Sequence, residues 1–179
     1  MSAAAGPSPD LENLTSLAQA VLMALGAIGQ PASRGHVART LVKTGVAPAA
    51  EPWIRQPEQM LPLLGSLQRA GLVSEVRGFW CLTSESREPA CRLAHGRGVF
   101  KPLAAAGQAT HGSGAVLLDP LQRDLVAFRL AFYEGRTEDW MALQERLRSA
   151  HQALLGTRDP LALIVGSPPY VTLLQLVGD

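Results

Sequence analysis

Residues 70–83, AGLVSEVRGFWCLT, carry the most informative pattern in this chain of 179 residues. Two short runs rich in apolar and aromatic residues, at 72–76 and 79–82, flank the pair Arg77-Gly78. Runs of this composition favour β-strands, and glycine supplies the positive φ that a tight two-residue turn needs. The sequence therefore predicts a β-hairpin that closes a small core.

Two segments before this hairpin have the periodicity of helices. The first begins near residue 11, with Asp10 as its predicted N-cap, and ends at Gly29. The second begins at the predicted N-cap Ser33 and ends at Gly45. Apolar residues in both segments recur every three or four positions, which predicts two amphipathic helices.

A third helix is predicted in the segment that begins at Pro57. Proline suits a first helical position, and Pro62 is expected either to weaken this helix or to lie in the first turn of a helix that starts later. The Pro-rich segment 46–56 before it is expected to break regular structure, with Trp53 and Ile54 anchoring it to the core. The predicted order is thus three helices and a hairpin.

This order, over roughly residues 11–84, resembles the winged helix-turn-helix superfamily. Three stretches carry the resemblance: ASRGHVARTL, MLPLLGSLQRAGLVSEV and GFWCLT. The resemblance implies that the hairpin is a wing and that the third helix is the recognition helix. The Pro-rich insertion departs from the compact pattern of the family and leaves the start of the recognition helix open.

The rest of the chain is expected to be mainly α-helical. Residues 1–10 are predicted to be a disordered tail, and residues 85–118 a linker, rich in glycine and small residues, that can hold one short helix. Residues 119–179 are predicted to form helical hairpins. The fold class is therefore mainly α, a winged helix followed by helical hairpins.

The helical hairpin has clear boundary signals. Asp119 and Thr137 are the predicted caps, and Gly135 and Gly156 are the predicted stops, of helices at 121–134 and 138–155. A predicted core stripe continues through both helices: Leu121, Leu125, Phe128, Phe132, Trp140, Leu143, Leu147, Ala150 and Leu154. The tripeptide DPL occurs at 119 and again at 159, and such spacing is compatible with the start of an α-solenoid.

Composition limits the function classes. The net charge is +1, so any nucleic-acid-binding face must be local. Two cysteines are too few for a disulfide framework and indicate a reducing compartment. No apolar run reaches the roughly 18 residues that a membrane span needs. We therefore expect a cytoplasmic protein with no membrane partner, and the Ala-, Arg- and Leu-rich composition suggests a bacterial source.

The candidate DNA-binding residues lie between positions 31 and 80. This segment has six basic and three acidic side chains, a local net charge of +3. Arg39 and Lys43 share one face of the second helix, and Arg77 is at the predicted wing tip, whereas Glu58 and Leu63 make the recognition helix a poor reading surface. The predicted contacts to duplex DNA are Arg34, His36, Arg39, Lys43, Arg55, Gln59, Ser66, Arg69 and Arg77. His36 is expected to be a surface residue that can reach a phosphate.

Metal binding and catalysis have little support in the sequence. Cys91 and His95 are four residues apart, but Cys81 and His111 lack the spacing of a zinc site. No nucleophile–base motif is present, and THGSGAV, residues 110–116, lacks the lysine of a phosphate-binding loop. We therefore expect no metal, no cofactor and no enzymatic activity in these residues.

Three functional interpretations follow. The first is a non-catalytic module that binds and targets duplex DNA at the amino end of a larger bacterial protein. The layout resembles the amino-terminal regions of large bacterial SWI/SNF-type ATPases, which implies an ATPase further along such a protein. The second is a protein-interaction scaffold that docks a protein partner, or downstream domains of its own chain, through Leu63 and the Trp53 loop. The third is a small transcription regulator that dimerises through its C-terminal helices.

Overall fold

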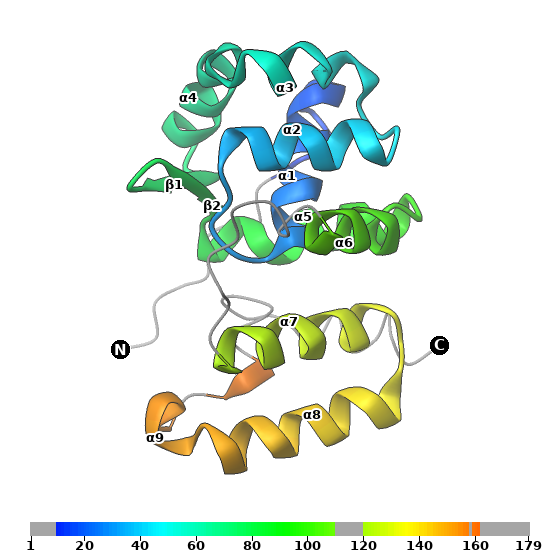
Figure 1. Cartoon of the computed structure of the whole chain (residues 1–179), viewed down its shortest axis with the longest axis vertical. Coiled ribbons are helices and arrows are strands. Elements are labelled where there is room, and N and C mark those ends of the chain that lie inside the picture. Colours follow the sequence, from blue (N-terminus) through cyan, green and yellow to red (C-terminus); the bar gives the residue numbers. More distant parts are fainter. Residues whose placement is uncertain (1–9, 110–119, 158, 162–179) are drawn as a thin grey trace. The chain divides into compact units, whose positions relative to one another are not determined.

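The computed structural model describes residues 10–109, 120–157 and 159–161 (Figure 1). These residues are mainly helical and contain one two-stranded antiparallel sheet, so the predicted mainly α class is confirmed. The chain divides into two compact units, Met1–Thr110 and His111–Asp179. The predicted disordered tail falls almost wholly on residues 1–9, which lie outside the described part of the chain.

Helices dominate the first unit, and a hairpin interrupts them after α4. Its elements are, in chain order, α1 (Ser16–Ile28), α2 (Arg34–Lys43), the 3₁₀ turn η1 (Pro48–Ala50), α3 (Pro52–Arg55), the 3₁₀ turn η2 (Pro57–Met60), α4 (Leu61–Arg69), β1 (Val73–Val76), β2 (Phe79–Leu82), α5 (Ser84–Gly96) and α6 (Phe100–Ala109). The second unit contains α7 (Pro120–Tyr133), α8 (Thr137–Ala150) and α9 (Gln152–Leu155).

Helix α1 forms the centre of the first unit. Every residue from position 18 to position 28 is buried, because α2, α5, α6 and β2 all pack against this helix. Two glycines allow the close approach. A Cβ at Gly26 would lie 3.2 Å from the Cys91 Sγ of α5, and a Cβ at Gly107 of α6 would lie only 2.9 Å from the Ile28 Cγ1.

The predicted start of α1 is wrong by several residues. The carboxylate of Asp10 accepts hydrogen bonds from the backbone N–H of Glu12 and the side chain of Asn13, and so closes a turn before the helix. The N-cap is Thr15, whose hydroxyl accepts a hydrogen bond from the backbone N–H of Ala18 at 3.3 Å. The predicted stop at Gly29 is confirmed by its left-handed φ of 69°.

The segment between α2 and the hairpin is more regular than predicted. Ser33 caps α2 by accepting a hydrogen bond from the backbone N–H of His36 at 3.2 Å. The Pro-rich segment 46–56 holds η1 and α3, so the prediction that it breaks regular structure is wrong. Trp53 is buried as predicted, whereas Ile54 is exposed. Pro62 lies in the first turn of α4, which confirms the alternative of a later start.

The hairpin forms where the opening stretch predicts it. Strands β1 and β2 pair in the register Val73↔Leu82 to Val76↔Phe79. Both turn residues, Arg77 and Gly78, have positive φ, 53° and 83°, as a two-residue hairpin turn requires. Trp80 also forms a bridge with Ala32, in which each backbone N–H donates to the other residue's carbonyl at 2.8 Å. This bridge fixes the hairpin beside the start of α2.

The predicted linker is wrong for residues 85–109. The short helix expected near 87–96 is part of α5, and a further helix, α6, follows it. Both helices pack on α1 and bury apolar side chains such as Cys91, Phe100 and Leu103. The core of the first unit therefore extends well past the predicted boundary at residue 84. Residues 110–118 lie outside the described part of the chain.

The second unit contains the predicted helical hairpin. Helices α7 and α8 pack together. The centroid of the Trp140 ring lies 5.9 Å from the ring centroid of Phe132 and 6.2 Å from that of Phe128. The N-cap of α8 is Arg136 rather than Thr137. The predicted single helix over 138–155 is interrupted at His151, at the boundary between α8 and α9.

This interruption changes which residues the second unit buries. Leu154 is exposed and Leu155 is buried, because the break shifts the apolar stripe by one position. The second DPL motif behaves as a cap, since the Asp159 carboxylate accepts a hydrogen bond from the backbone N–H of Leu161 at 3.1 Å. Asp119 lies outside the described residues, as do positions 162–179. The α-solenoid stays a prediction.

Candidate nucleic-acid interface

Three of the predicted cations lie on α2. Arg34 begins this helix and is half-buried beside the Ala32–Trp80 bridge. Arg39 and Lys43 are exposed one turn apart. The guanidinium of Arg39 folds back over Gly35, where a Cβ would lie 3.3 Å from Nη1.

The other three cations lie at the ends of elements. Arg55 ends α3, Arg69 ends α4 and Arg77 occupies the hairpin turn; all three are exposed. Figure 1 shows α2 starting on the side of the unit where the hairpin lies and running away from it, with α3 and α4 on the far side of α2 from α5 and α6. The predicted cations are thus distributed over α2, α3, α4 and the hairpin turn.

These six basic side chains share one property. None of them forms an ion pair with another described residue. Elsewhere in the described part of the chain, arginines on α5 and α8 and at the start of α8 pair with carboxylates: Arg92 with Glu88, Arg136 with Glu134 and Asp139, Arg146 with Asp124, and Arg148 with Asp159. Within the described part of the chain, the basic side chains of residues 31–80 therefore have no carboxylate partner that binding an anion would displace.

His36 does not fit the predicted surface role. Its side chain is 6% exposed and lies on the buried face of α2 with Val37, Thr40 and Leu41. The prediction that it is a surface residue able to reach a phosphate is wrong, because residue 36 is one turn before Thr40 on the face of the helix that packs inward. His36 belongs to the core.

The polar candidates of η2 and α4 hydrogen-bond locally. The Ser66 hydroxyl donates to the Leu63 carbonyl at 3.1 Å, and the Arg69 Nε donates to the Gly65 carbonyl at 3.2 Å. The side-chain amide of Gln59 donates to the side-chain carbonyl of Gln56. These three side chains, predicted to contact bases or phosphates, thus each direct one polar atom toward their own segment.

Several apolar side chains of the first unit are exposed. Val76 and Phe79 face each other across the hairpin and are 54% and 40% exposed. Leu61 in the first turn of α4 is 42% exposed, and Leu63 is half-buried. The Trp53 side chain lies in the core, so the predicted docking through the Trp53 loop would fall to exposed residues of that loop, such as Ile54. The exposed apolar side chains of the first unit thus lie on the hairpin, on α3 and in the first turn of α4.

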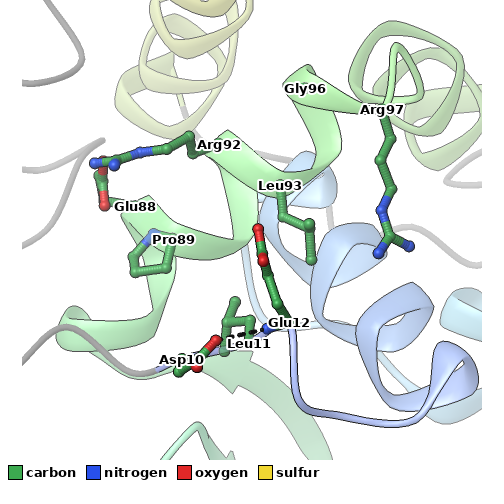
Figure 2. A pocket seen from close by; sticks show the side chains of 9 residues that line it. All are labelled: Asp10, Leu11, Glu12, Glu88, Pro89, Arg92, Leu93, Gly96 and Arg97. Carbon is green, nitrogen blue, oxygen red and sulfur yellow. Dashed lines mark hydrogen bonds and ion pairs between the residues drawn. The ribbon is translucent and has the colours of Figure 1, made fainter.

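A cavity of about 530 Å³ lies on another part of the first unit, between residues 10–12 and α5 (Figure 2). Its charged lining is mixed, with Asp10, Glu12 and Glu88 facing Arg92 and Arg97. Glu88 pairs with Arg92, and Arg97 donates to the side-chain carbonyl of Gln19 at 2.6 Å. Of these charged groups, Glu88 and Arg92 thus neutralise each other, whereas Arg97 binds a neutral amide.

The residues considered for metal binding do not meet. Cys91 is buried whereas His95, one turn later on α5, is exposed, and Cys81 lies on β2 with its Sγ 3.2 Å from the Ser74 hydroxyl. Within the described residues, no group of three or more His, Cys, Asp or Glu side chains is placed to hold a metal ion. His111 lies outside that part of the chain.

We compared the chain with known protein families, curated proteins and solved structures. No family model, no curated protein and no solved structure matches this chain. None of the described helices is long and apolar enough to cross a membrane.

Proposed function

We propose that the first unit is a winged-helix module that binds duplex DNA and performs no catalysis itself. The observation that carries this proposal is the absence of ion-pair partners, among the described residues, for the six basic side chains of residues 31–80. The order of helices and hairpin supports it, as does the bridge that holds the hairpin beside α2.

The physical basis is counterion release. DNA carries condensed cations along its phosphates, and each protein cation that replaces one makes binding more salt-dependent. The logarithm of the binding constant falls with the logarithm of salt concentration with a slope of about −0.9 for each phosphate neutralised. If most of the six basic side chains contact phosphates, we expect a slope between about −4 and −5.

The test is a titration of a fluorescently labelled duplex with the full chain at several salt concentrations. The variant Arg39→Glu/Lys43→Glu removes two exposed cations from α2. It should weaken binding and reduce the magnitude of the salt slope by about 2. Absence of binding by the parent protein at low salt would refute the proposal.

The matched control is Lys101→Glu/Arg148→Glu. Both residues are exposed, Lys101 on α6 and Arg148 on α8, and the Arg148–Asp159 ion pair is a loose surface contact of 3.7 Å. This double variant changes the net charge of the chain by the same amount as the α2 variant. It should bind the duplex with nearly the parental salt slope. Thermal unfolding of all three proteins checks that each is folded.

A protein-interaction scaffold is the second candidate. The observation in its favour is the exposed pair Val76 and Phe79 on the hairpin, since exposed apolar side chains that gather together mark contact surfaces. The duplex titration of the parent protein, repeated with Val76→Ser/Phe79→Ser, distinguishes the two candidates. A DNA-binding module keeps its salt-dependent affinity for the duplex in this variant, whereas a scaffold has no such affinity to keep.

A further inference from the structure

We infer that the first unit binds duplex DNA through its phosphates and does not select a base sequence. This inference rests on the proposed DNA-binding function and specifies its substrate as duplex DNA of any sequence. It follows from two features of the molecule, the side chains of the recognition helix and the placement of the basic residues.

The first turn of α4 is unsuited to reading bases. In helix-turn-helix proteins the N-terminal residues of the recognition helix contact base edges in the major groove, and discrimination comes mainly from bidentate hydrogen bonds by Arg, Lys, Asn and Gln. The first turn of α4 instead begins with Leu61, Pro62 and Leu63. None of these side chains can donate or accept a hydrogen bond.

The polar residues near this turn do not compensate for it. The Ser66 hydroxyl and the Arg69 Nε each donate to a backbone carbonyl of α4, and the amide of Gln59 donates to Gln56. Using the Ser66 hydroxyl hydrogen or the Arg69 Nε–H on a base would require breaking a hydrogen bond within α4. The remaining donors of Arg69 lie at the last residue of α4 rather than in its first turn. Glu58 is exposed near the same end of the segment, where its negative charge repels phosphate.

The basic side chains are placed outside this turn. Arg39 and Lys43 are on α2, Arg55 is at the end of α3, and Arg77 is in the hairpin turn. Lysine and arginine at such positions hold the backbone of a duplex and carry no sequence information by themselves. The cationic contacts are thus separate from the surface that would have to read the bases.

The experiment is a competition assay with the full chain at a fixed, moderate salt concentration. A labelled duplex of mixed sequence is displaced by unlabelled duplexes of equal length, one GC-rich, one AT-rich and one scrambled. Repeated selection from a random-sequence duplex pool then searches for any preferred motif. We expect the competitors to differ by less than about tenfold and the selection to enrich no motif, whereas sequence-specific proteins discriminate by roughly a thousandfold or more.

The outcomes separate this inference from the proposed function. A preference above tenfold, or an enriched motif, overturns the inference and leaves DNA binding intact. Failure of every duplex to bind at low salt overturns the proposed function itself. Equal binding by all duplexes, weakened equally by Arg39→Glu/Lys43→Glu, supports both.

Discussion

The substitution Gly107→Ala tests whether α6 belongs to the core of the first unit. An alanine Cβ at this position would lie 2.9 Å from the Ile28 Cγ1 and 3.8 Å from the Ile28 Cα. Favourable carbon–carbon contacts lie at about 3.5–4.0 Å, so the Ile28 side chain must move by more than half an ångström. It must do so inside α1, where its neighbours are buried.

The magnitude follows from two opposing effects. Overpacking a well-packed core costs about 1–3 kcal/mol, while replacing glycine by alanine within a helix gains up to about 1 kcal/mol. We therefore expect Gly107→Ala to lower the free energy of unfolding of the first unit by about 1 kcal/mol. Gly107→Val should lower it further, because its two additional methyl groups require a larger displacement.

Gly65→Ala is the matched control. Gly65 lies inside α4, and no atom lies within 4 Å of the position that its Cβ would occupy. This variant should gain about 0.5–1 kcal/mol of stability. Opposite signs for the two glycine substitutions would therefore report a steric contact at α6 rather than a general effect of alanine.

Urea unfolding measures the difference. In a Trp140→Phe background the fluorescence reports Trp53 and Trp80, both buried in the first unit. The midpoint should fall for Gly107→Ala and rise for Gly65→Ala with unchanged m-values. If Gly107→Ala is as stabilising as Gly65→Ala, then α6 does not press on α1 at Gly107, and the reasoning from this close contact is refuted.

Two further substitutions test a cap and a carboxylate. Ser33→Ala removes the hydroxyl that accepts a hydrogen bond from the His36 N–H. It should lower the free energy of unfolding, measured in urea, by about 1 kcal/mol. Because aspartate can also cap a helix, equal unfolding midpoints for Ser33→Ala and Ser33→Asp would show that no cap forms. Burial tends to raise the pKa of Asp124, but hydrogen bonds from His151 and Arg146 outweigh it and hold the pKa below the ordinary value of 3.8. The second unit should therefore lose stability as the pH falls below about 4. Thermal unfolding over that pH range should show a smaller loss for Asp124→Asn than for the parent. Equal losses would mean that the folded protein does not specifically stabilise this carboxylate.

Features that depend on a few neighbouring residues were predictable from the sequence. The turn at Arg77-Gly78 follows from the need for positive φ, and the cap at Ser33 and the stop at Gly29 follow from the groups that helix ends leave unsatisfied. The prediction of Asp10 as the N-cap of the first helix was wrong for a similarly local reason. Its carboxylate forms a turn that resembles a cap, and the sequence does not distinguish this turn from the true start of α1 five residues later.

Features that depend on contacts between distant segments were not predictable. The small residues at 104–107 are typical of a linker, but they are equally typical of two helices in close contact, and Gly107 allows such a contact with α1. His36 is polar and lies on the same helix as the exposed Arg39, yet it faces the core. In both cases the deciding partner is another element, and a pattern within one helix does not reveal it.

The apolar first turn of α4 argues against base recognition at the proposed site. The six basic side chains without ion-pair partners among the described residues argue for phosphate binding, and their energetic cost to the fold is small. An exposed ion pair contributes only about 0–1 kcal/mol to stability, so the first unit loses little because its six basic side chains form no ion pair with the described residues. Residues 31–80 carry +3 in a chain of net charge +1, which leaves −2 for the rest. We therefore expect a polyanion to be attracted to this segment rather than to the chain as a whole. The variants Arg39→Glu/Lys43→Glu and Lys101→Glu/Arg148→Glu test this expectation directly. Both have the same net charge, but only the first removes positive charge from residues 31–80.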